Sequence, residues 1–579
     1  MINNYTDFMD GKSLLTIDDL TVVFNSGNQE TKAIDGVTFS LGHSETVGIV
    51  GESGSGKTVT ALTILKLIPS PPAKIVCGSI IFNDLPERGK DLLRISEKEI
   101  QAIRGMKISM IFQEPMTSLN PVFTCGNQVA ESLYQHLHLN RREAKEKVFE
   151  LFNEVKLPVP KRIYASYPHE LSGGQKQRIM IAMAIACNPK ILIADEPTTA
   201  LDVTVQKNIL ELLQRLQVDR KMSIIFITHD LGLISGIANR VVVMYQGKIV
   251  EEGSVEQLFK RPKHNYTKGL MACRPPLDVR LRRLPTIDDF IHNSTPSNEI
   301  ITQEERTREH QKTYSLSPIL DVMGVRKEFS TPTSFMSGRH KSVLVLDNIT
   351  FSVYSGETLG IVGESGSGKT TLARTILELI PPSQGSIKYK DIEITRLTAK
   401  TLKKLRKDLQ IVFQDPYSSL NPRQTIGVSI MEPIIVHKIF QSNKERKEET
   451  LKLLQQVGLD PDFFYRYPHE FSGGQRQRIC IARALAVQPR LIICDEPVSA
   501  LDVSIQAQVL NLLNELKTKL GLTYIFISHD LSVVKFMADR LIVLKNGKIV
   551  EMGDADKIYT NPKAEYTRQL LEAVPRSLY

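Results

Sequence analysis

The chain has 579 residues, of which 41% are hydrophobic and 24% charged, and this length and composition indicate about two to four soluble globular domains. Its net charge of +9 is modest and selects no partner among nucleotides, acidic lipids and nucleic acids. No apolar run reaches the roughly 18 residues of a membrane-spanning helix, and no arginine-glycine tract or aromatic-basic repeat indicates a nucleic-acid module.

The N-terminal residues and the cysteines indicate the compartment. The first residues lack a basic region followed by an apolar one, so we expect no secretory signal. The cysteines are scattered, with no CxxC pair and no metal-like spacing, at Cys77, Cys125, Cys187, Cys273, Cys480 and Cys494. Cys187, Cys480 and Cys494 lie in apolar stretches, which favours burial as small hydrophobic residues. We therefore expect a cytosolic protein without a disulfide framework.

One segment of the chain occurs twice, because residues 48–58 and 360–370 both read GIVGESGSGKT. The repeat predicts two copies of one nucleotide-binding unit, over residues 14–273 and 318–579. In each copy, apolar β-branched runs alternate with helix-like stretches. TVGIV and TLGIV precede glycine-rich turns, ILIAD and LIICD end in an acid, and SIIFITHD and TYIFISHD contain a histidine near their ends. This alternation is typical of a mainly parallel α/β sheet, which binds ligands at the carboxyl ends of its strands.

The glycine-rich turns fit the phosphate-loop pattern G-x-x-x-x-G-K-[ST]. Glycines let backbone N–H groups point at phosphate oxygens, and the following helix N-terminus adds a favourable dipole. The lysine is expected to reach the β- and γ-phosphates and the threonine to ligate Mg²⁺. The residues concerned are Gly51, Glu52, Ser53, Gly54, Ser55, Gly56, Lys57 and Thr58, and Gly363, Glu364, Ser365, Gly366, Ser367, Gly368, Lys369 and Thr370.

Two acids follow the second apolar strand of each copy. Asp195 and Asp495 suit a Mg²⁺ shell, and Glu196 and Glu496 are placed to polarise an attacking water. A capping acid at a strand end is the alternative interpretation, and the phosphate loop upstream in both copies argues against it. The stretch between Gln113 and Ser172 instead predicts a separate helical subdomain, with runs such as RREAKEKVFELFNEV.

The phosphate loops and acids alone indicate a P-loop NTPase. The segments LSGGQKQRI and FSGGQRQRI narrow the class of NTPase, because they resemble the signature of the ATP-binding-cassette (ABC) ATPase family. The signature residues are Ser172, Gly173, Gly174 and Gln175, and Ser472, Gly473, Gly474 and Gln475. The resemblance implies two tandem P-loop NTPase domains. Each would combine a RecA-like, mainly parallel sheet with an antiparallel β subdomain and a helical subdomain. It also implies that the two cassettes pair within the chain, each ATP lying between one phosphate loop and the other signature.

Further site residues follow from this resemblance. Gln113 and Gln414 match the Q-loop glutamine, which senses Mg²⁺ and the permease, so the implied Mg²⁺ ligands are Thr58, Gln113, Asp195, Thr370, Gln414 and Asp495. Ala200-Leu201-Asp202 and Ala500-Leu501-Asp502 match the D-loop, and His229 and His529 match the switch histidine. Phe24 and Phe329 are candidates to stack on adenine, although a core phenylalanine would look the same. No catalytic position is degenerate, so we expect two hydrolysis-competent sites.

Finer features resemble the oligopeptide, dipeptide and nickel import branch. These are FQEPMTSLNP and FQDPYSSLNP, YPHELSGGQ and YPHEFSGGQ, and the later segments HNYTKGL and AEYTRQLL. The resemblance implies two fused ATP subunits, peripheral on the cytoplasmic face of the inner membrane. They would drive two transmembrane permeases supplied by an extracytoplasmic solute-binding protein, with peptide as the expected solute. Some members carry an iron–sulfur cluster, but only Cys273 lies in the corresponding region, so we expect none.

The segment 274–317 between the copies predicts a partly ordered linker, because it is rich in proline, polar residues and charge. Arg280, Arg282 and Arg283 are expected to form a solvated charge run, with a lipid or partner contact as the alternative.

Other functions remain to be weighed. An exporter ATPase with separate membrane subunits is the main rival. A ribosome-associated tandem cassette would need a long helical hairpin as its linker, which the prolines here would break. A DNA-repair cassette would need zinc-binding CxxC insertions, which are absent from the sequence.

Overall fold

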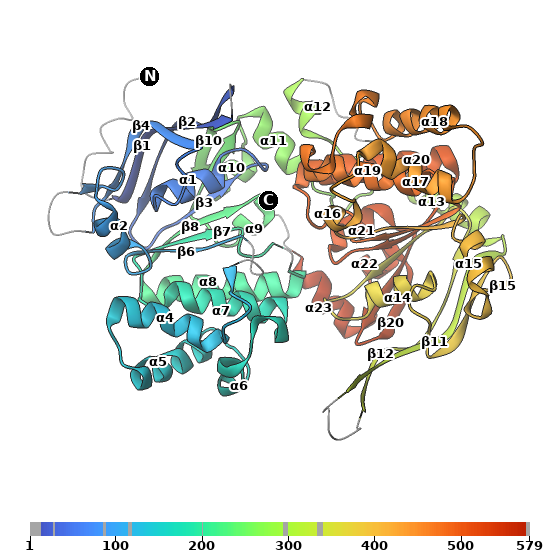
Figure 1. Ribbon diagram of the computed structural model, residues 1–579, viewed down its shortest axis with the longest axis horizontal. Coiled ribbons are helices and arrows are strands. Elements are labelled where there is room, and N and C mark those ends of the chain that lie inside the picture. The colour runs from blue at the N-terminus through green and yellow to red at the C-terminus, as the bar shows by residue number, and fades with distance from the viewer. Residues whose placement is uncertain are drawn as a thin grey trace. The chain divides into compact units, whose positions relative to one another are not determined.

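The computed structural model describes residues 13–26, 29–84, 89–113, 118–199, 201–292, 299–332 and 340–574. Their contacts divide the chain into two compact units, which repeat one architecture (Figure 1). The first unit runs to Leu201 and resumes at Val205–Met271, and the second comprises Asp202–Thr204 and Ala272–Val574. The residues predicted to form a linker therefore pack with the second unit.

The first unit contains two sheets. One is antiparallel, in the spatial order β2 (Gln29–Gly42), β1 (Ser13–Ser26), β4 (Ala73–Phe82) and β5 (Lys90–Asp91). In the other, five strands are parallel and only β10, at one edge, is antiparallel. Its order is β10 (Lys248–Ser254), β9 (Arg240–Tyr245), β3 (Thr46–Val50), β8 (Ser223–Thr228), β7 (Ile191–Asp195) and β6 (Ile108–Ile111).

The helices of the first unit follow the strands in the alternation that the sequence predicts. The predicted helical subdomain is present between Gln113 and the signature as α4 (Cys125–Leu137), α5 (Arg141–Glu154) and α6 (Pro160–Ala165), which pack with α7 (Gly173–Ile185). The remaining helices are α1 (Lys57–Ile64), α2 (Glu97–Ile103), α8 (Val203–Arg220), α9 (Leu231–Ile234), α10 (Val255–Lys260) and α11 (Asn265–Ala272).

The second unit repeats both sheets. Its antiparallel sheet has the order β12 (His340–Tyr354), β11 (Pro318–Pro332), β14 (Gln384–Tyr389) and β15 (Ile392–Glu393). Its larger sheet is again parallel except at one edge. The order is β16 (Leu409–Val412), β17 (Leu491–Asp495), β18 (Thr523–Ile527), β13 (Thr358–Val362), β19 (Arg540–Lys545) and β20 (Lys548–Asp554).

The helices of the second unit include two that precede its first strand, α12 (Ile287–Ile291) and α13 (Gln303–Tyr314). The helical subdomain is repeated as well. It is formed by α17 (Ile426–Val436) and α18 (Asn443–Gln456), which precede the signature, and by α19 (Gly473–Leu485), which begins within it. The others are α14 (Lys369–Ile376), α15 (Ala399–Leu405), α16 (Pro416–Ser419), α20 (Val503–Leu520), α21 (Leu531–Met537), α22 (Ala555–Thr560) and α23 (Glu565–Ala573).

The main core of each unit lies where the two sheets meet the helix that follows the glycine-rich loop. In the first unit, Phe39 and Ile80 of the antiparallel sheet join Ile49 and Ile193 of the parallel sheet and Ile64 of α1. The second unit has the equivalent cluster. Strands β3 and β13 are buried along their whole length, which fixes the turns that follow them. Cys187, Cys480 and Cys494 are buried free thiols, as predicted. No helix among the described residues is long and apolar enough to cross a membrane.

The prediction of a solvated charge run is wrong for Arg280, whose side chain is only 8% exposed. Its guanidinium donates to the carbonyl oxygens of Ala538 (2.9 Å) and Phe536 (3.4 Å) and pairs with Asp556 (3.2 Å). The guanidinium therefore lies at the C-terminal end of α21. The carbonyl oxygens there and the Asp556 carboxylate compensate for the burial of its charge. Arg282 and Arg283 are 51% and 43% exposed and pair with acids of their own segment.

Other residues of the 274–317 segment also bind the second unit. Arg306 donates to the Asp539 carbonyl (2.7 Å) and pairs with Asp554 and Asp556. The Asn511 side chain exchanges two hydrogen bonds with the backbone of Leu284 (2.8 and 2.9 Å), which is fully buried. The described part of this segment is thus a docked extension of the second unit, which we call the docked arm (residues 278–292 and 299–314).

Candidate functional site

Each phosphate loop leaves a buried strand and enters a helix, as the sequence predicts. In the first unit the loop joins β3 to α1, and the Lys57 ammonium donates to the carbonyl oxygens of Gly51 (2.7 Å) and Glu52 (2.8 Å). Lys369 makes the same two contacts with Gly363 (2.8 Å) and Glu364 (3.0 Å). Both lysines are 5% exposed, so each ammonium lies inside the curl of its loop.

The last glycine of each loop is required by its conformation. Gly56 has φ 100° and Gly368 has φ 104°, in the left-handed region that side chains disfavour. A Cβ on Gly56 would also lie 2.7 Å from the Ala33 carbonyl oxygen, and one on Gly368 would lie 2.9 Å from the Leu346 side chain. Any other residue would therefore push the loop out of the position that directs its N–H groups inward.

A hydroxyl and a carboxylate meet beside each loop. The Thr58 hydroxyl, at the start of α1, donates to Asp195 at the end of β7 (3.3 Å), and Thr370 donates to Asp495 (3.2 Å). Burial raises the pKa of Asp195 to about 6, and burial together with the Glu496 charge raises the pKa of Asp495 to about 6. A buried carboxylate whose charge is this disfavoured is stabilised by a cation.

The two predicted catalytic glutamates accept hydrogen bonds from the predicted glutamine and histidine. Gln113 donates to Glu196 (3.0 Å), and His229 lies 3.3 Å from the same carboxylate. In the second unit Gln414 (2.9 Å) and His529 (3.1 Å) hold Glu496 in the same way. Residues far apart in the sequence thus converge at the carboxyl edge of each parallel sheet.

The backbone of both glutamates is unusual, because Glu196 has φ 45° and Glu496 has φ 49°. A left-handed conformation is uncommon for a residue with a side chain and persists only where the surroundings impose it. Here the N–H of each glutamate donates to the carbonyl of the neighbouring strand, at Ile227 and Ile527 (both 2.9 Å). The turn directs each carboxylate to the same cluster as the glutamine and the histidine.

The charges of these groups are coupled. Burial of Glu196 raises its pKa, but hydrogen bonding and the charge of His229, with help from Thr199 and Lys57, more than offset burial and lower the pKa to about 2. Burial opposes ionisation of Glu496 as well, yet His529 and Lys369 lower its pKa. Both glutamates are therefore anionic at neutral pH, suited to orienting and polarising a water.

The two clusters differ at one residue that the sequence reasoning missed. The Thr199 hydroxyl donates to the Glu196 carboxylate (2.9 Å), whereas the equivalent Ser499 hydroxyl donates to the Glu496 backbone carbonyl (3.1 Å). Both residues lie three positions after their glutamate, and this spacing could have indicated a contact with the carboxylate. A serine or threonine at such a position is, however, also common in an ordinary turn.

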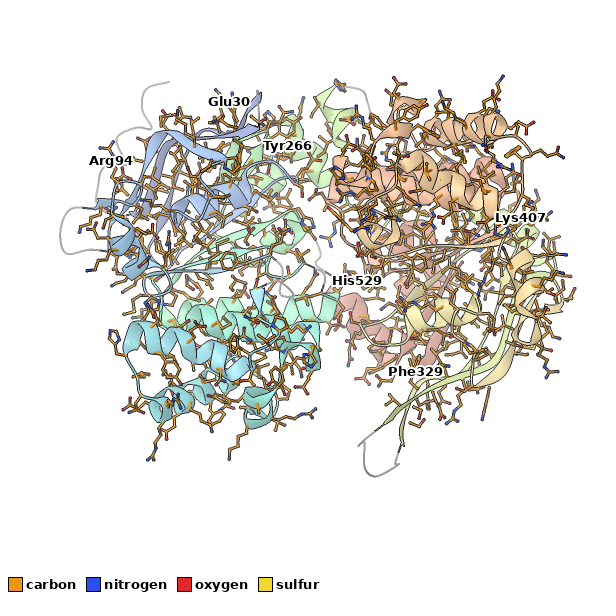
Figure 2. The ribbon with its side chains drawn as sticks, viewed as in Figure 1. Glu30, Arg94, Tyr266, Phe329, Lys407 and His529 are labelled. Atoms are coloured by element: carbon orange, nitrogen blue, oxygen red, sulfur yellow. The ribbon has the colours of Figure 1, made fainter. Side chains whose placement is uncertain are left out.

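Sequence reasoning also missed two tyrosines. Tyr266 and Tyr566 accept hydrogen bonds from loop N–H groups, at Glu52 (2.9 Å) and Glu364 (3.2 Å). They lie in the segments HNYTKGL and AEYTRQLL, which resemble the C-terminal extension of the import branch. Figure 2 labels Tyr266 on α11.

The signature residues lie away from these clusters in their own units, at the N-termini of α7 and α19. Ser172 and Gln175 cap α7 reciprocally, and Ser472 and Gln475 cap α19 in the same way. Asp502 lies at the N-terminal cap position of α20, and Asp202 is nearly buried. Of the D-loop residues, Ala200 lies outside the described part of the chain. The predicted roles of these segments remain predictions.

The two candidate adenine-stacking residues differ in their surroundings. Phe24 is partly buried and packs against the core of the first unit. Phe329 is 38% exposed, lies on the β11–β12 ribbon (Figure 2) and has the Lys327 ammonium 5.1 Å from its ring centroid. Adenine stacking stays a prediction for both rings.

The residues present fit a magnesium nucleotide. The buried Ser55 and Ser367 hydroxyls have no hydrogen-bond partner within the described residues, so polar capacity is left inside both loops. Threonine, glutamine and aspartate supply the hard oxygen donors that Mg²⁺ prefers. No cluster of three or more acidic, histidine or cysteine side chains among the described residues could hold a metal ion alone.

Comparisons with known proteins agree with this geometry. The family model described as ABC transporter matches residues 34–199 and 346–499. The model described as oligopeptide/dipeptide transporter, C-terminal region, matches residues 250–296 and 550–577. These second matches include Tyr266 and Tyr566.

Curated relatives match over almost the whole chain. The glutathione import ATP-binding protein of Salmonella choleraesuis is 46% identical over 575 residues, covering 99% of this chain and 91% of the relative. The protein of the same name in Escherichia coli O157:H7 is 45% identical over 579 residues, with the same coverage.

Among solved structures, a dimeric ATP-binding cassette in a post-hydrolysis state with ADP and Pi is 31% identical. It covers 41% of this chain and 98% of its own, with a TM-score of 0.37. The family matches and the full-length identity show that the chain belongs to the ABC transporter family, as an ATP-hydrolysing protein with two tandem cassettes.

Proposed function

We propose that this chain is the energy-coupling ATPase of an importer of small peptides, with glutathione-like peptides as the first solutes to test. One observation carries the proposal, namely 46% identity over 99% of the chain to glutathione import ATP-binding proteins. The oligopeptide/dipeptide C-terminal region, matched after each cassette, supports the same conclusion.

Within each cassette we propose the following division of work. The phosphate loop and its lysine, Lys57 or Lys369, hold the β- and γ-phosphates of ATP, because both ammonium groups already lie within their loops. Glu196 and Glu496 orient the attacking water, and His229 and His529 fix these carboxylates and contact the γ-phosphate.

Mg²⁺ would be held by Thr58, Gln113 and Asp195 in the first cassette and by Thr370, Gln414 and Asp495 in the second, and it would neutralise charge on the phosphates. The support is the pair of hydroxyl–carboxylate contacts and the raised aspartate pKa values.

We further propose that each signature completes the ATP site of the other cassette, with Asp202 and Asp502 at that junction. The support is the family membership and the exposed N-terminal caps at Ser172 and Ser472. Two transmembrane permeases and an extracytoplasmic solute-binding protein would complete the transporter. The chain would lie peripherally at the cytoplasmic face of the membrane.

Uptake of radiolabelled glutathione and of a dipeptide in a host lacking the chain's own gene tests the solute class. We expect the intact chain to restore uptake of at least one of them, and Glu196→Gln with Glu496→Gln to abolish it. Glu150→Gln, an exposed glutamate on α5, is the matched control and should transport normally. Restoration of neither solute by the intact chain, with normal ATP hydrolysis, would contradict peptide import.

A further inference from the structure

The C-terminal region of each cassette reaches back to the phosphate loop of that same cassette. Tyr266 of α11 is fully buried, and its hydroxyl accepts from Glu52 N–H, which lies 214 positions earlier in the chain. Tyr566 of α23 makes the equivalent contact with Glu364 N–H over 202 positions. Most residues around the two tyrosines differ, since the segments read HNYTKGL and AEYTRQL. The contact with the loop N–H is nevertheless the same.

These hydrogen bonds act on the peptide group that also binds the loop lysine. The Gly51 carbonyl and the Glu52 N–H belong to one peptide unit. The carbonyl accepts from Lys57 (2.7 Å), and the N–H donates to Tyr266 (2.9 Å). Because the peptide is planar, fixing the N–H direction also fixes the carbonyl direction. In the second cassette, Lys369 and Tyr566 hold the Gly363–Glu364 peptide in the same way.

Each tyrosine is itself held by its surroundings. The Glu251 carboxylate of β10 accepts from the N–H groups of Lys263 (2.8 Å) and His264 (3.0 Å), just before α11. Glu551 of β20 binds the start of the α23 segment identically, at Lys563 (2.8 Å) and Ala564 (3.1 Å). These contacts tie each short helix to the β hairpin at the edge of its sheet.

The rings are packed as well. The Tyr266 ring centroid lies 4.3 Å from that of Tyr245, and the Lys545 ammonium lies 4.2 Å from the Tyr566 ring centroid. Each hydroxyl is thus presented to its loop by a side chain with little freedom to move.

We infer that Tyr266 and Tyr566 are positioning residues of the two ATP sites, through which the C-terminal region of each cassette preorganises its phosphate loop for ATP. Each hydroxyl binds the backbone of its loop, so the inferred role is positioning and not chemistry. Their effect is to hold the first peptide of the loop, and with it the lysine contact, in the conformation described here. The inference rests on the ATPase activity of the chain and is independent of the transported solute.

The test is Tyr266→Phe and Tyr566→Phe, singly and together, in the full-length protein. Each change removes one hydroxyl and keeps the ring. A neutral hydrogen bond contributes about 0.5–1.5 kcal/mol, so we expect the KM for MgATP to rise about 2- to 10-fold in the double variant. Because the loop binds ground state and transition state alike, kcat should change less than about twofold.

Tyr524→Phe is the matched control. Tyr524 is fully buried and its hydroxyl donates to the Leu513 carbonyl (3.1 Å), outside the phosphate loop. Its substitution also removes one buried hydrogen bond between a tyrosine hydroxyl and the backbone, and it should leave the KM for ATP unchanged. If Tyr524→Phe raised the KM as much as the two test variants, the effect would be general loss of stability and the inference would be wrong.

Photolabelling with 8-azido-ATP below saturation, with labelled peptides assigned by mass spectrometry, resolves the two cassettes. Tyr266→Phe should reduce labelling of the first cassette and spare the second, and Tyr566→Phe should do the reverse. Equal loss in both cassettes, or no loss in either, would overturn the inference. Transport assays play no part in this readout, so a failure of the peptide-import proposal would leave the result interpretable.

Discussion

At the scale of single residues, Glu196 and Glu496 are held in place by the protein alone. Each carboxylate contacts a glutamine and a histidine, and each backbone is fixed in the left-handed region. A water-orienting group gains most when its own position needs no reorganisation during the reaction. Because the two clusters share these glutamine and histidine contacts, we expect both sites to hydrolyse ATP.

The first prediction follows from this equivalence. Because each proposed ATP site needs both cassettes, the two sites should turn over together, and Glu196→Gln and Glu496→Gln, made separately, should each lower the ATPase rate by about 10²-fold or more, the scale of a lost general base. Steady-state phosphate release by the purified chain measures the effect. If either single variant kept a rate near that of the wild type, hydrolysis at two competent sites would be excluded.

The hydroxyl contacts that differ between the clusters give a second prediction. Thr199 bonds the Glu196 carboxylate, and Ser499 bonds only a backbone carbonyl. Thr199→Val, which keeps the side-chain shape, should reduce kcat about 2- to 10-fold, the equivalent of one hydrogen bond. Ser499→Ala is the natural comparison and should change kcat less. Equal effects would show that the Thr199 contact does not support Glu196.

At the scale of elements, the docked arm gives the second cassette contacts that a flexible linker would lack. Arg306, 9% exposed, binds the Asp539 carbonyl and pairs with Asp554 and Asp556. At the corresponding positions of the first cassette the residues are Asn239, Ser254 and Glu256. Asn239 and Ser254 lack the carboxylates that lie 3.7 and 3.4 Å from His310 of the arm in the second cassette, so the first cassette does not repeat the surface that binds the arm.

The third prediction is a stability difference within the arm. Arg306→Ala removes a guanidinium that is only 9% exposed, binds the Asp539 carbonyl and pairs with two half-buried acids, and should destabilise the second cassette by about 1.5–3 kcal/mol. Arg283→Ala removes an exposed pair with Asp289 and should cost less than about 1 kcal/mol. Urea unfolding of the full chain, with the transitions assigned to each cassette, measures both. Similar losses in the two variants would show that the arm contributes no buried interactions.

The fourth prediction concerns pH and Asp539. Burial raises its pKa, but Lys517, His310 and the Thr358 N–H outweigh burial and hold the pKa well below the ordinary 3.8. A group with a depressed folded pKa adds stability above its unfolded pKa and loses it as pH falls toward the folded value. Asp539→Asn should therefore be less stable than wild type at pH 7, and the difference should narrow between about pH 5 and pH 3.

Urea unfolding of both proteins across this pH range is the measurement. Asp288→Asn changes an exposed acid on α12 and serves as the control, with a small effect on stability expected. A stability difference for Asp539→Asn that stayed constant down to pH 3 would contradict the assignment of the stabilisation to the ionised carboxylate.

The elements also show what the sequence could and could not predict. The phosphate loops, the strand ends at Asp195 and Asp495 and the helical subdomains follow from local patterns, and the structure contains them. The tyrosine contacts join residues about 200 positions apart, and no local pattern encodes such a pairing. The burial of Arg280 could not be predicted, because charged residues are rarely buried unless paired and its partners lie in distant parts of the sequence.

At the scale of the whole molecule, the chain is two cassettes of one design with one added element. Contacts assign the chain from Ala272 onward to the second cassette. This part includes the docked arm, although the arm lies between the two repeats in the sequence. The arm contributes the buried Leu284 and Ile287 as well as Arg280 and Arg306. The second cassette therefore begins, in structural terms, before its first strand at Pro318.

This placement gives the last prediction. A fragment of residues 272–579 should melt at least about 5 °C above a fragment of residues 318–579, because each kcal/mol shifts Tm by a few degrees in a domain of this size. Calorimetry of the two fragments measures the difference. The longer fragment with Arg280→Ala and Arg306→Ala is the control and should approach the shorter one, since the arm would then lose its two buried charges. Equal melting of the unmodified fragments would mean that the arm adds no net stability to the second cassette, and its role would then be restricted to joining the two cassettes.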